Sequence, residues 1–217
     1  MSHITLIRHG QANSGAQDEA SYDKLSALGH QQSAWLGTHL RNQNQHHVRL
    51  YTGTLKRHIE TARSMDTGLT PTRDARLNEL EYLTLARALE EEHGIPFPTD
   101  QVGFTTHLPK VFAYWQRDEI AGAPERFSDF EDRVGAALAE IAEGDGPALV
   151  VTSGGLISMA MRQVLRLDIT AMAQMALAIY NTSQHRLFPI GGTLSPTMFN
   201  AIPHLEDPDR HYAQTHV

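Results

Sequence analysis

The sequence predicts an α/β fold, a three-layer α/β/α sandwich whose sheet is mostly parallel with one antiparallel strand. Two observations support this: short β-branched apolar segments alternate with segments of helical periodicity, and two of the apolar segments run directly into glycine-containing polar turns. The chain has 217 residues, 41% of them apolar, which is enough for one hydrophobic core. We therefore expect a single domain over residues 1–217, with a lid or insertion at about residues 80–126.

The first third of the chain contains two predicted strand–helix units. Residues 3–8 and 48–52 are short and rich in β-branched or apolar side chains, which is typical of buried strands. A turn at residues 26–29 precedes a helix expected to reach about Asn42. A second helix is expected from Thr54 to Ser64. Each strand is thus followed by a helix, as in a parallel sheet.

The middle of the chain has a weaker pattern. Tyr82–Glu92 has helical periodicity and is expected to end at Gly94, with Pro96 and Pro98 beyond it. Residues 94–126 mix proline and glycine with apolar side chains. We interpret them as the irregular part of the insertion or lid.

A clear helix signal returns at residue 128. Ser128 and Glu131 have the spacing of a capping box, and Gly144 is expected to end the helix. Its apolar face has helical spacing and comprises Phe127, Phe130, Val134, Leu138 and Ile141.

The last third adds further strands. Residues 147–152 predict a strand, Ser153–Gly155 a tight turn, and Leu156–Leu165 a helix. Residues 184–190 and 194–200 predict two more strands of the same sheet, one of them antiparallel.

Composition excludes several classes of function. The 18 Lys and Arg against 25 Asp and Glu give a formal net charge of −7, which argues against nucleic-acid binding. No apolar run is long enough to span a membrane, and the N-terminus does not resemble a signal peptide, so a cytoplasmic protein is expected. The absence of cysteine excludes disulfides, thiolate metal sites and cysteine nucleophiles.

Arg8-His9-Gly10 follows the first predicted strand, at the edge where open α/β sheets bind ligands. The planar fork of an arginine matches phosphate oxygens, and a histidine with one unprotonated ring nitrogen can act as a nucleophile. A second basic residue, Arg57, lies in the first turn of the helix after the second strand, where an anion is favoured. Each segment alone is a weak signal: an ordinary surface contact at the strand end is an alternative for Arg8-His9-Gly10, and an ordinary solvated helix is the better interpretation of the Arg57 segment taken by itself.

Together these segments resemble the histidine phosphatase superfamily, which has the phosphoglycerate-mutase-like fold. The matching segments span most of the chain except residues 94–126: Arg8-His9-Gly10, Leu25–Gln32, Thr54–Thr61, Leu77-Asn78-Glu79, Val150–Gly155, Asn181-Thr182-Ser183 and Phe199–Leu205. The last two resemble features of one bacterial branch.

The resemblance implies a role for each matching residue. His9 would be the nucleophile that takes the phosphoryl group, and Arg8 and Arg57 would bind its equatorial oxygens. Glu79 would be the general acid and then the general base, although without the resemblance it could not be told from Glu81. Further phosphate contacts are expected first from Asn13 and then from Gln11 and Ser14. No metal or other cofactor is needed, because the arginines supply the positive charge.

The sequence departs from the family at residue 153. Ser153 stands where the family has a second histidine, which bonds the transferring phosphoryl group, and Ser153-Gly154-Gly155 resembles the bacterial branch that has a serine at this position. A neutral hydroxyl donates a weaker hydrogen bond than a protonated imidazole, so full turnover is in question. The N–H groups of Gly154 and Gly155, at the start of the next helix, would compensate in part.

The implied function is a phosphatase that hydrolyses a phosphomonoester, either a phosphorylated small molecule or a phosphoprotein, through a phosphohistidine on His9. Two alternatives remain open: a regulatory module that binds a phosphate ligand with little or no turnover, and a phosphoglycerate-mutase-type phosphotransferase. A mutase must bind a second anionic group, and only Lys110 and Arg117 in the insertion are candidates for that.

The histidines and the methionines of the chain suggest two further interpretations. Of the 13 histidines, His46, His47, His204, His211 and His216 suggest a metal site, but their spacing fits no ligand pattern. Five methionines between Met159 and Met198 predict core packing, although Met161, Met172 and Met175 would equally suit the face of a homodimer.

Overall fold

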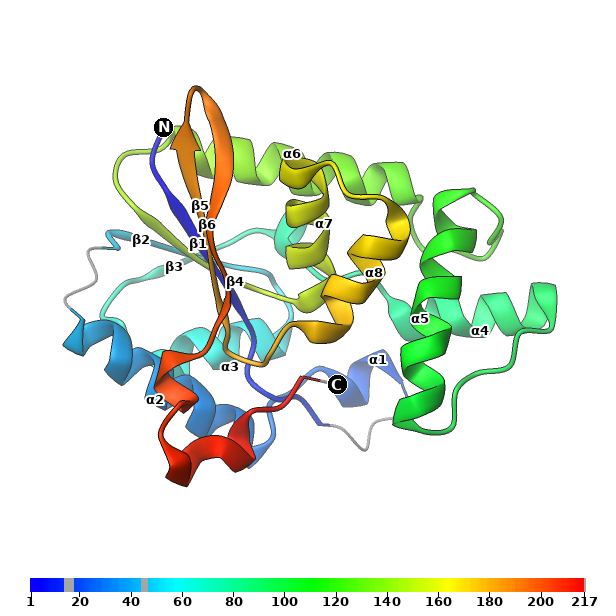
Figure 1. Cartoon of the computed structure of the whole chain (residues 1–217), viewed down its shortest axis with the longest axis horizontal. Coiled ribbons are helices and arrows are strands. Elements are labelled where there is room, and N and C mark those ends of the chain that lie inside the picture. The colour runs from blue at the N-terminus through cyan, green and yellow to red at the C-terminus, as the bar shows by residue number, and fades with distance from the viewer. Residues whose placement is uncertain (14–17, 44–46, 217) are drawn as a thin grey trace.

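The computed structural model describes residues 1–13, 18–43 and 47–216. A six-stranded sheet forms its centre, with the strand order β3-β2-β4-β1-β5-β6 (Figure 1). The strands are β1 (Ile4–Arg8), β2 (Arg49–Thr52), β3 (Pro71–Arg73), β4 (Ala148–Thr152), β5 (Gln184–Ile190) and β6 (Thr193–Ala201). The α-helices are α1 (Glu19–Tyr22), α2 (Ala27–Asn42), α3 (Lys56–Met65), α4 (Tyr82–His93), α5 (Gln101–Gln116), α6 (Phe127–Glu143), α7 (Gly154–Leu165) and α8 (Ile169–Ala178). Short 3-10 helices lie at Ala75–Leu77, Pro203–Leu205 and Pro208–Ala213.

The sheet is mostly parallel, as the sequence predicts. β4 pairs in parallel with both β1 and β2, and β2 pairs in parallel with β3. β5 runs antiparallel to β1 and to β6, so it is the one strand of reversed direction. The predicted α/β fold with one antiparallel strand is therefore confirmed.

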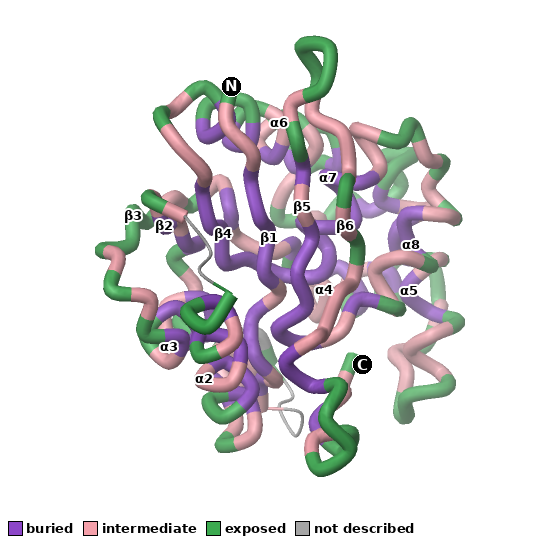
Figure 2. Tube along the Cα trace, turned by 60° about the vertical axis from the view of Figure 1, so that its left-hand side comes forward, coloured by how far each residue is buried: buried purple, intermediate pink, exposed green. Residues whose placement is uncertain are grey.

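Side chains alternate between two hydrophobic layers, one on each face of the sheet. Leu6 of β1 and Val150 of β4 belong to the larger layer, whereas Ile7 and Val151 belong to the smaller one. Helices α2 and α3 cover one face of the sheet, and α6 and α7 cover the other (Figure 1). The central strands are almost continuously buried (Figure 2), which is typical of strands covered by helices on both sides.

Residues 94–126 are more regular than the sequence predicts. They contain the 16-residue helix α5, which includes Pro109 and is capped by Asp100, whose side chain accepts a hydrogen bond from the Gly103 backbone N–H at 2.7 Å. The Pro and Gly spacing obscured an apolar stripe that packs into the larger hydrophobic layer: Leu108, Val111, Phe112 and Trp115. Burial of this stripe offsets the hydrogen bond that Pro109 removes.

Four predicted helix starts differ from the structure: α2 begins at Ala27, inside the predicted turn at residues 26–29, α3 begins at Lys56 rather than Thr54, and the starts of α6 and α7 differ as well. Helix α6 begins at Phe127 after Arg126, which makes no side-chain capping bond, so Ser128 lies inside the helix and there is no capping box. Helix α7 begins at Gly154 rather than Leu156, and Ser153 is its N-cap residue. The two glycines thus form the first turn of a helix rather than a separate turn, which places their backbone N–H groups at a positive helix end.

Besides α5 and the three 3-10 helices, three elements have no counterpart in the sequence prediction: α1, β3 and α8. The methionines that precede or lie in α8 are largely core residues, since Met159, Met161 and Met172 are wholly buried. Core packing is thus confirmed for these three, so Met161 and Met172 cannot form the predicted face of a homodimer, and a homodimer itself remains a prediction. Within the described part of the chain, no helix has the length and apolar character needed to cross a membrane.

Candidate active site

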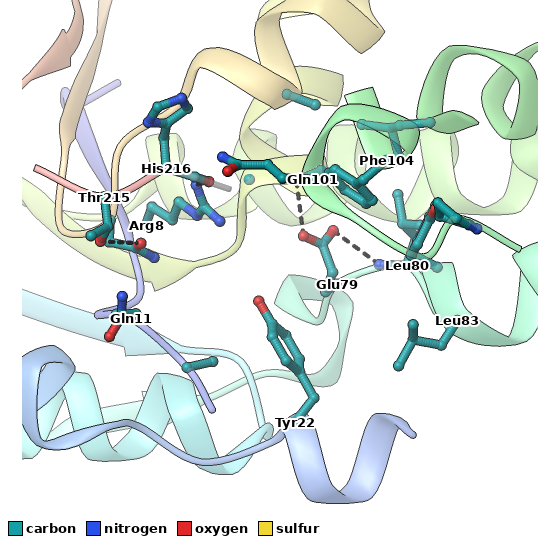
Figure 3. A pocket seen from close by; sticks show the side chains of 18 of the residues that line it. Arg8, Gln11, Tyr22, Glu79, Leu80, Leu83, Gln101, Phe104, Thr215 and His216 are labelled. Atoms are coloured by element: carbon teal, nitrogen blue, oxygen red, sulfur yellow. Dashed lines mark hydrogen bonds between the residues drawn. The ribbon is translucent and has the colours of Figure 1, made fainter. Parts of the chain in front are cut away.

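The residues singled out from the sequence meet where β1, β2 and β4 end. Arg8 is the last residue of β1, Arg57 lies in the first turn of α3, and Gly154 begins α7 after β4. A cavity of about 560 Å³ opens at this edge of the sheet (Figure 3). Its lining includes the five residues that we call the basic end, which are Arg8, His9, Arg57, Glu79 and Gly154.

His9 is held in one orientation and one tautomer. Its ring is 2% exposed, and Nδ1 lies 2.7 Å from the backbone oxygen of Gly10. A carbonyl oxygen can only accept, so Nδ1 carries the proton and Nε2 carries the lone pair. Burial lowers the pKa of His9 well below its ordinary value, and the charges of Arg57 and Arg8 lower it further. The ring is therefore neutral, with Nε2 available as a nucleophile.

The two arginines flank His9 and are fixed by different partners. Arg57 Nη1 donates to Asp23 Oδ1 at 3.1 Å, and its guanidinium lies over the ring of Tyr22. Arg8 Nη1 donates to the backbone oxygens of Ile179 and His216. Nε of each arginine is buried and has no hydrogen-bond partner among the described residues. A buried N–H of this kind is normally satisfied, so the Nε groups of Arg8 and Arg57 are available to an anion in the cavity.

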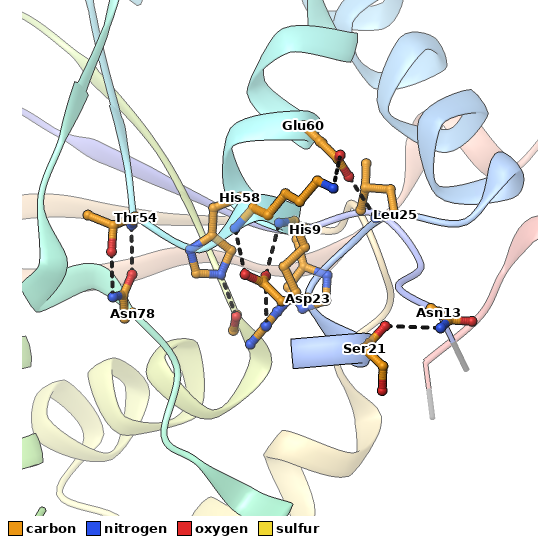
Figure 4. Close-up of polar contacts among 12 residues, drawn as sticks. His9, Asn13, Ser21, Asp23, Leu25, Thr54, His58, Glu60 and Asn78 are labelled. Atoms are coloured by element: carbon orange, nitrogen blue, oxygen red, sulfur yellow. Dashed lines mark hydrogen bonds and ion pairs between the residues drawn. The ribbon is translucent and has the colours of Figure 1, made fainter. Parts of the chain in front are cut away.

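Asp23 was not singled out from the sequence, although it organises the start of α3. Its carboxylate accepts the backbone N–H groups of Lys56 and Arg57 at 2.8 and 3.1 Å, which takes the place of a side-chain N-cap within α3 (Figure 4). The same carboxylate binds the Arg57 side chain. No local sequence signal links residues 23 and 57, because the contact joins two separate segments.

Glu79 is positioned by hydrogen bonds to the two residues before it and to its own carboxylate. Thr152 Oγ1 donates to the backbone oxygen of Leu77 at 2.7 Å, and Asn78 exchanges two hydrogen bonds with Thr54. The Glu79 carboxylate accepts the backbone N–H groups of Gly155 at 2.9 Å and of Leu80 at 3.0 Å (Figure 3). The carboxylate therefore lies at the N-terminus of α7, beside the basic end.

Close backbone contact explains two of the motif glycines. A Cβ atom on Gly10 would lie 2.3 Å from the backbone oxygen of Gly29, and one on Gly29 would lie 2.1 Å from the backbone oxygen of Gln11. Gly10 N–H also donates to Thr61 Oγ1 at 3.0 Å. The loop after His9 thus packs directly on the start of α2 and on α3, which fixes the histidine.

Ser153 is buried and contacts a histidine that sequence analysis missed. Its Oγ lies 2.6 Å from Nε2 of His58, and both residues are completely buried. The His58 ring centroid lies 5.7 Å from that of His9. Burial lowers the pKa of His58 well below its ordinary value, with a further contribution from Arg57, so this ring is neutral as well. In the sequence, the position of His58 next to Arg57 was the only indication that it belongs to the site.

The other predicted phosphate contacts lie in different places. Gln11 lines the cavity, and its side-chain oxygen accepts from Ser26 Oγ at 2.7 Å. Asn13 donates to the backbone oxygen of Ser21 at 3.0 Å and is not a lining residue. Ser14 lies outside the described residues. Glu81 is exposed and accepts from Thr84 Oγ1, so Glu79 is the one of this pair that reaches the cavity.

The C-terminal segment forms part of the cavity and is not a detached tail. Thr215 and His216 line the cavity beside Asn181, whose Nδ2 donates to the backbone oxygen of His9 at 3.2 Å. Asn181 Oδ1 in turn accepts from Thr215 Oγ1 at 2.8 Å. Asn181 thus connects the loop that carries His9 to the C-terminal segment, which gives a physical reason for the Asn181-Thr182-Ser183 motif.

The histidines considered for metal binding make separate contacts. Nε2 of His204 bonds Thr182 Oγ1 at 2.8 Å, and Nε2 of His211 bonds the backbone oxygen of Glu206 at 3.0 Å. Nε2 of His47 lies 3.0 Å from Thr5 Oγ1, and His46 lies outside the described residues. Across residues 1–13, 18–43 and 47–216, no three His, Asp or Glu side chains are grouped as metal ligands.

Solved structures with the same fold cover nearly the whole chain. A phosphoserine phosphatase mutant from Entamoeba histolytica, in complex with phosphoserine, is 16% identical, with a TM-score of 0.70 over 94% of this chain and 100% of its own. A phosphoglycerate mutase from Bacillus anthracis is 20% identical, with a TM-score of 0.68 over 94% of each chain. A mycobacterial glucosyl-3-phosphoglycerate phosphatase is 21% identical, with a TM-score of 0.66 over 93% of this chain and 99% of its own.

Sequence comparisons give a family but no individual relative. No match was found among curated protein sequences. The model of the histidine phosphatase superfamily (branch 1) matches residues 4–201, a range that contains every residue of the basic end. The chain therefore belongs to the histidine phosphatase superfamily.

Proposed function

We propose that the protein hydrolyses a phosphomonoester through a phosphohistidine intermediate on His9. The observation that carries this proposal is the state of His9, which is buried and neutral, with its proton on Nδ1 and two arginines beside it. A neutral imidazole held this way presents a lone pair, and the arginines favour an electrophile that carries negative charge. A phosphate ester is such an electrophile.

The proposed reaction has two displacements at phosphorus. Nε2 of His9 attacks the phosphorus, the bond to the ester oxygen breaks, and Glu79 gives its proton to the leaving oxygen. Glu79 then takes a proton from water, whose oxygen attacks the phosphohistidine and releases inorganic phosphate and neutral His9. Arg8 and Arg57 hold the equatorial oxygens in both steps, through N–H groups that include the unpartnered Nε atoms.

For the position of the family's second histidine, we propose that Ser153 and His58 act as a pair. A neutral His58 with its proton on Nε2 donates to Ser153 Oγ across the 2.6 Å contact. The serine hydroxyl then has its own proton free to donate, and its oxygen is polarised by the imidazole. Ser153 and His58 are completely buried and are not lining residues of the cavity; a role for the hydroxyl at the phosphoryl group is supported only by its position directly before Gly154, which does line it.

The residues that line the cavity favour hydrolysis over mutase activity. A mutase must bind a second anionic group, yet the only Lys or Arg residues among the described lining are Arg8 and Arg57. Lys110 is exposed on α5 away from the lining, and Arg117 is paired with Glu119 at 2.6 Å. The retained His9 and Glu79 also favour an enzyme over a regulatory module without turnover.

Rapid-quench labelling tests the proposed function. The wild-type protein and His9→Ala are mixed with a ³²P-labelled phosphomonoester, and acid-labile, base-stable label on the protein is followed with time. We expect label on the wild type alone, appearing and disappearing at rates consistent with steady-state turnover. A label that persists would favour the regulatory module, and hydrolysis by His9→Ala would remove His9 as the nucleophile.

A further inference from the structure

The part of the cavity furthest from the sheet has a lining unlike the basic end. The first turn of α4 and one face of α5 supply most of it, together with a residue between the two helices. We call this set the apolar wall: Leu80, Tyr82, Leu83, Phe97, Phe104, Leu108 and Phe112. The three residues from α5 are four positions apart, so they form one stripe along the helix.

Aromatic contacts hold the apolar wall together. The rings of Tyr82 and Phe104 meet edge to face with 5.0 Å between centroids, and Phe97 lies 6.4 Å from Tyr82. The Tyr82 hydroxyl is bonded to Nδ1 of His107 at 2.9 Å. Figure 3 shows Leu80, Leu83 and Phe104 around the cavity on the side of Glu79 away from His216. The wall is therefore a preformed surface of carbon atoms beside the leaving-group acid.

The charged groups near the wall do not suit a second anion. Asp100, a lining residue from the start of α5, is negative and accepts the Gly103 N–H. No Lys or Arg among the described lining residues belongs to the wall. An anionic group buried there would lose its hydration without a lysine or arginine of the described wall lining to pair with, since Lys110 beside His107 is exposed and is not a lining residue.

We infer that the cavity takes phosphate monoesters whose organic part is uncharged and apolar, either an aliphatic chain or an aromatic ring. This inference names the substrate class and rests on the proposed function. The phosphoryl group would lie at the basic end, with the organic part against the apolar wall and its ester oxygen near Glu79. The cavity volume of about 560 Å³ lies within the range of sites for small organic ligands.

A chain-length series of non-hydrolysable ligands tests the inference without relying on turnover. Binding of n-alkylphosphonates from ethyl to octyl is measured by titration calorimetry with the full chain. Transfer of one methylene from water to an apolar surface predicts a dissociation constant that falls about three- to four-fold per carbon until the wall is covered. An ω-carboxylate on the hexyl chain should weaken binding at least ten-fold. Affinity that does not change with chain length would overturn the inference.

Two phenylalanine variants locate the effect. Phe104→Ala should reduce the gain per methylene, because it removes one ring of the wall from a half-exposed position. Phe188→Ala is the matched control, since Phe188 is 43% exposed on β5 and lies outside the cavity. If the gain in affinity per methylene falls equally in both variants, or falls in neither, the apolar wall is not the binding surface.

Turnover of the corresponding n-alkyl phosphates separates this inference from the proposed function. The leaving alcohols have nearly the same acidity, so kcat/KM should follow chain length through binding alone. Rising phosphonate affinity without hydrolysis or label on His9 would contradict the phosphatase and leave the ligand class standing. Hydrolysis at a rate that is independent of chain length would support the phosphatase and contradict the inferred ligand class.

Discussion

The basic end and the apolar wall are built from different kinds of contact. His9, Arg57 and Glu79 are held by hydrogen bonds from strand ends and helix starts, and many of those partners are backbone groups. Phe104 and Leu83, by contrast, are half-exposed side chains on helices that contribute mainly apolar surface. Chemistry depends on sub-ångström placement, whereas apolar binding depends on area. Substitutions in the wall should therefore alter substrate preference, and those at the basic end should alter kcat.

The largest effect is expected from Glu79→Gln. The amide keeps the size of the side chain but cannot protonate the leaving oxygen, so kcat/KM for an alkyl phosphate, which reports the steps up to phosphorylation of His9, should fall about 10²- to 10⁴-fold. The loss of kcat/KM should be much smaller for 4-nitrophenyl phosphate, whose leaving group needs no proton, whereas kcat should fall for both substrates because water attack on the phosphohistidine also uses Glu79. Steady-state kinetics with both substrates measure the difference.

Glu81→Gln is the control for that prediction, because Glu81 is exposed and outside the cavity. It should retain wild-type kinetics with both substrates. Equal losses of kcat/KM for the two leaving groups in Glu79→Gln would mean that the carboxylate does not act as the acid.

The second-largest loss of activity is expected from Gly155→Ala. A Cβ atom at residue 155 would lie 2.3 Å from Glu79 Oε1 and 2.7 Å from a methyl carbon of Leu80, so the carboxylate must move. We expect kcat to fall about 10- to 100-fold with little change in melting temperature, because a displacement of about 1 Å has effects of this order. Gly135→Ala in the middle of α6 is the control and should keep its activity. A fully active Gly155→Ala would show that the position of Glu79 is not critical.

A smaller effect is expected from the Ser153–His58 pair, tested by a double-mutant cycle. Ser153→Ala and His58→Leu should each lower kcat about ten-fold, since each removes the buried hydrogen bond between these two residues. The double variant should be no slower than either single variant, because both changes remove the same unit. Losses that multiply would mean that the two residues act independently. Binding of the alkylphosphonates should keep its dependence on chain length in all three.

The sequence predicts the basic end better than the apolar wall, for a physical reason. Arg8, His9 and Arg57 follow strand ends, and parallel strands bring their carboxyl ends to one edge, so local sequence is enough to group them. Glu79 was identified by its resemblance to the family motif. Asp23 and His58 were missed, because their partners lie 34 and 95 residues away in the chain.

Helix α5 shows where local pattern fails. Pro109 and Gly103 are signals of irregular structure, yet both lie inside the helix. Leu108, Val111 and Phe112 decide the structure, because burying them against the neighbouring helices outweighs an unfavourable proline. Such tertiary compensation cannot be inferred from spacing alone, so the apolar wall became apparent only in three dimensions.

Acid should lower the stability of the folded protein, because His185 and His204 are buried close to the segments that carry the basic end. Burial lowers the pKa of both His185 and His204 to about 3, whereas the unfolded chain titrates near 6.5. Between these values the unfolded state binds the extra proton, so the stability contributed by each neutral histidine is complete above pH 6.5 and is lost as pH falls.

The expected slope is about 1.4 kcal/mol per pH unit for each such histidine. His204 lies against Thr182, whose backbone N–H bonds the Arg8 backbone oxygen, so its protonation should loosen the segment that carries Arg8 and His9. Denaturant unfolding from pH 7 to 4 measures the slope, and His204→Gln should make it shallower by one histidine's share. An unchanged slope would mean that the pKa of His204 is nearly the same in the folded and unfolded states, so that its protonation costs no stability. In that case the acid response would have to be assigned to the other buried histidines, which His185→Gln tests in the same way.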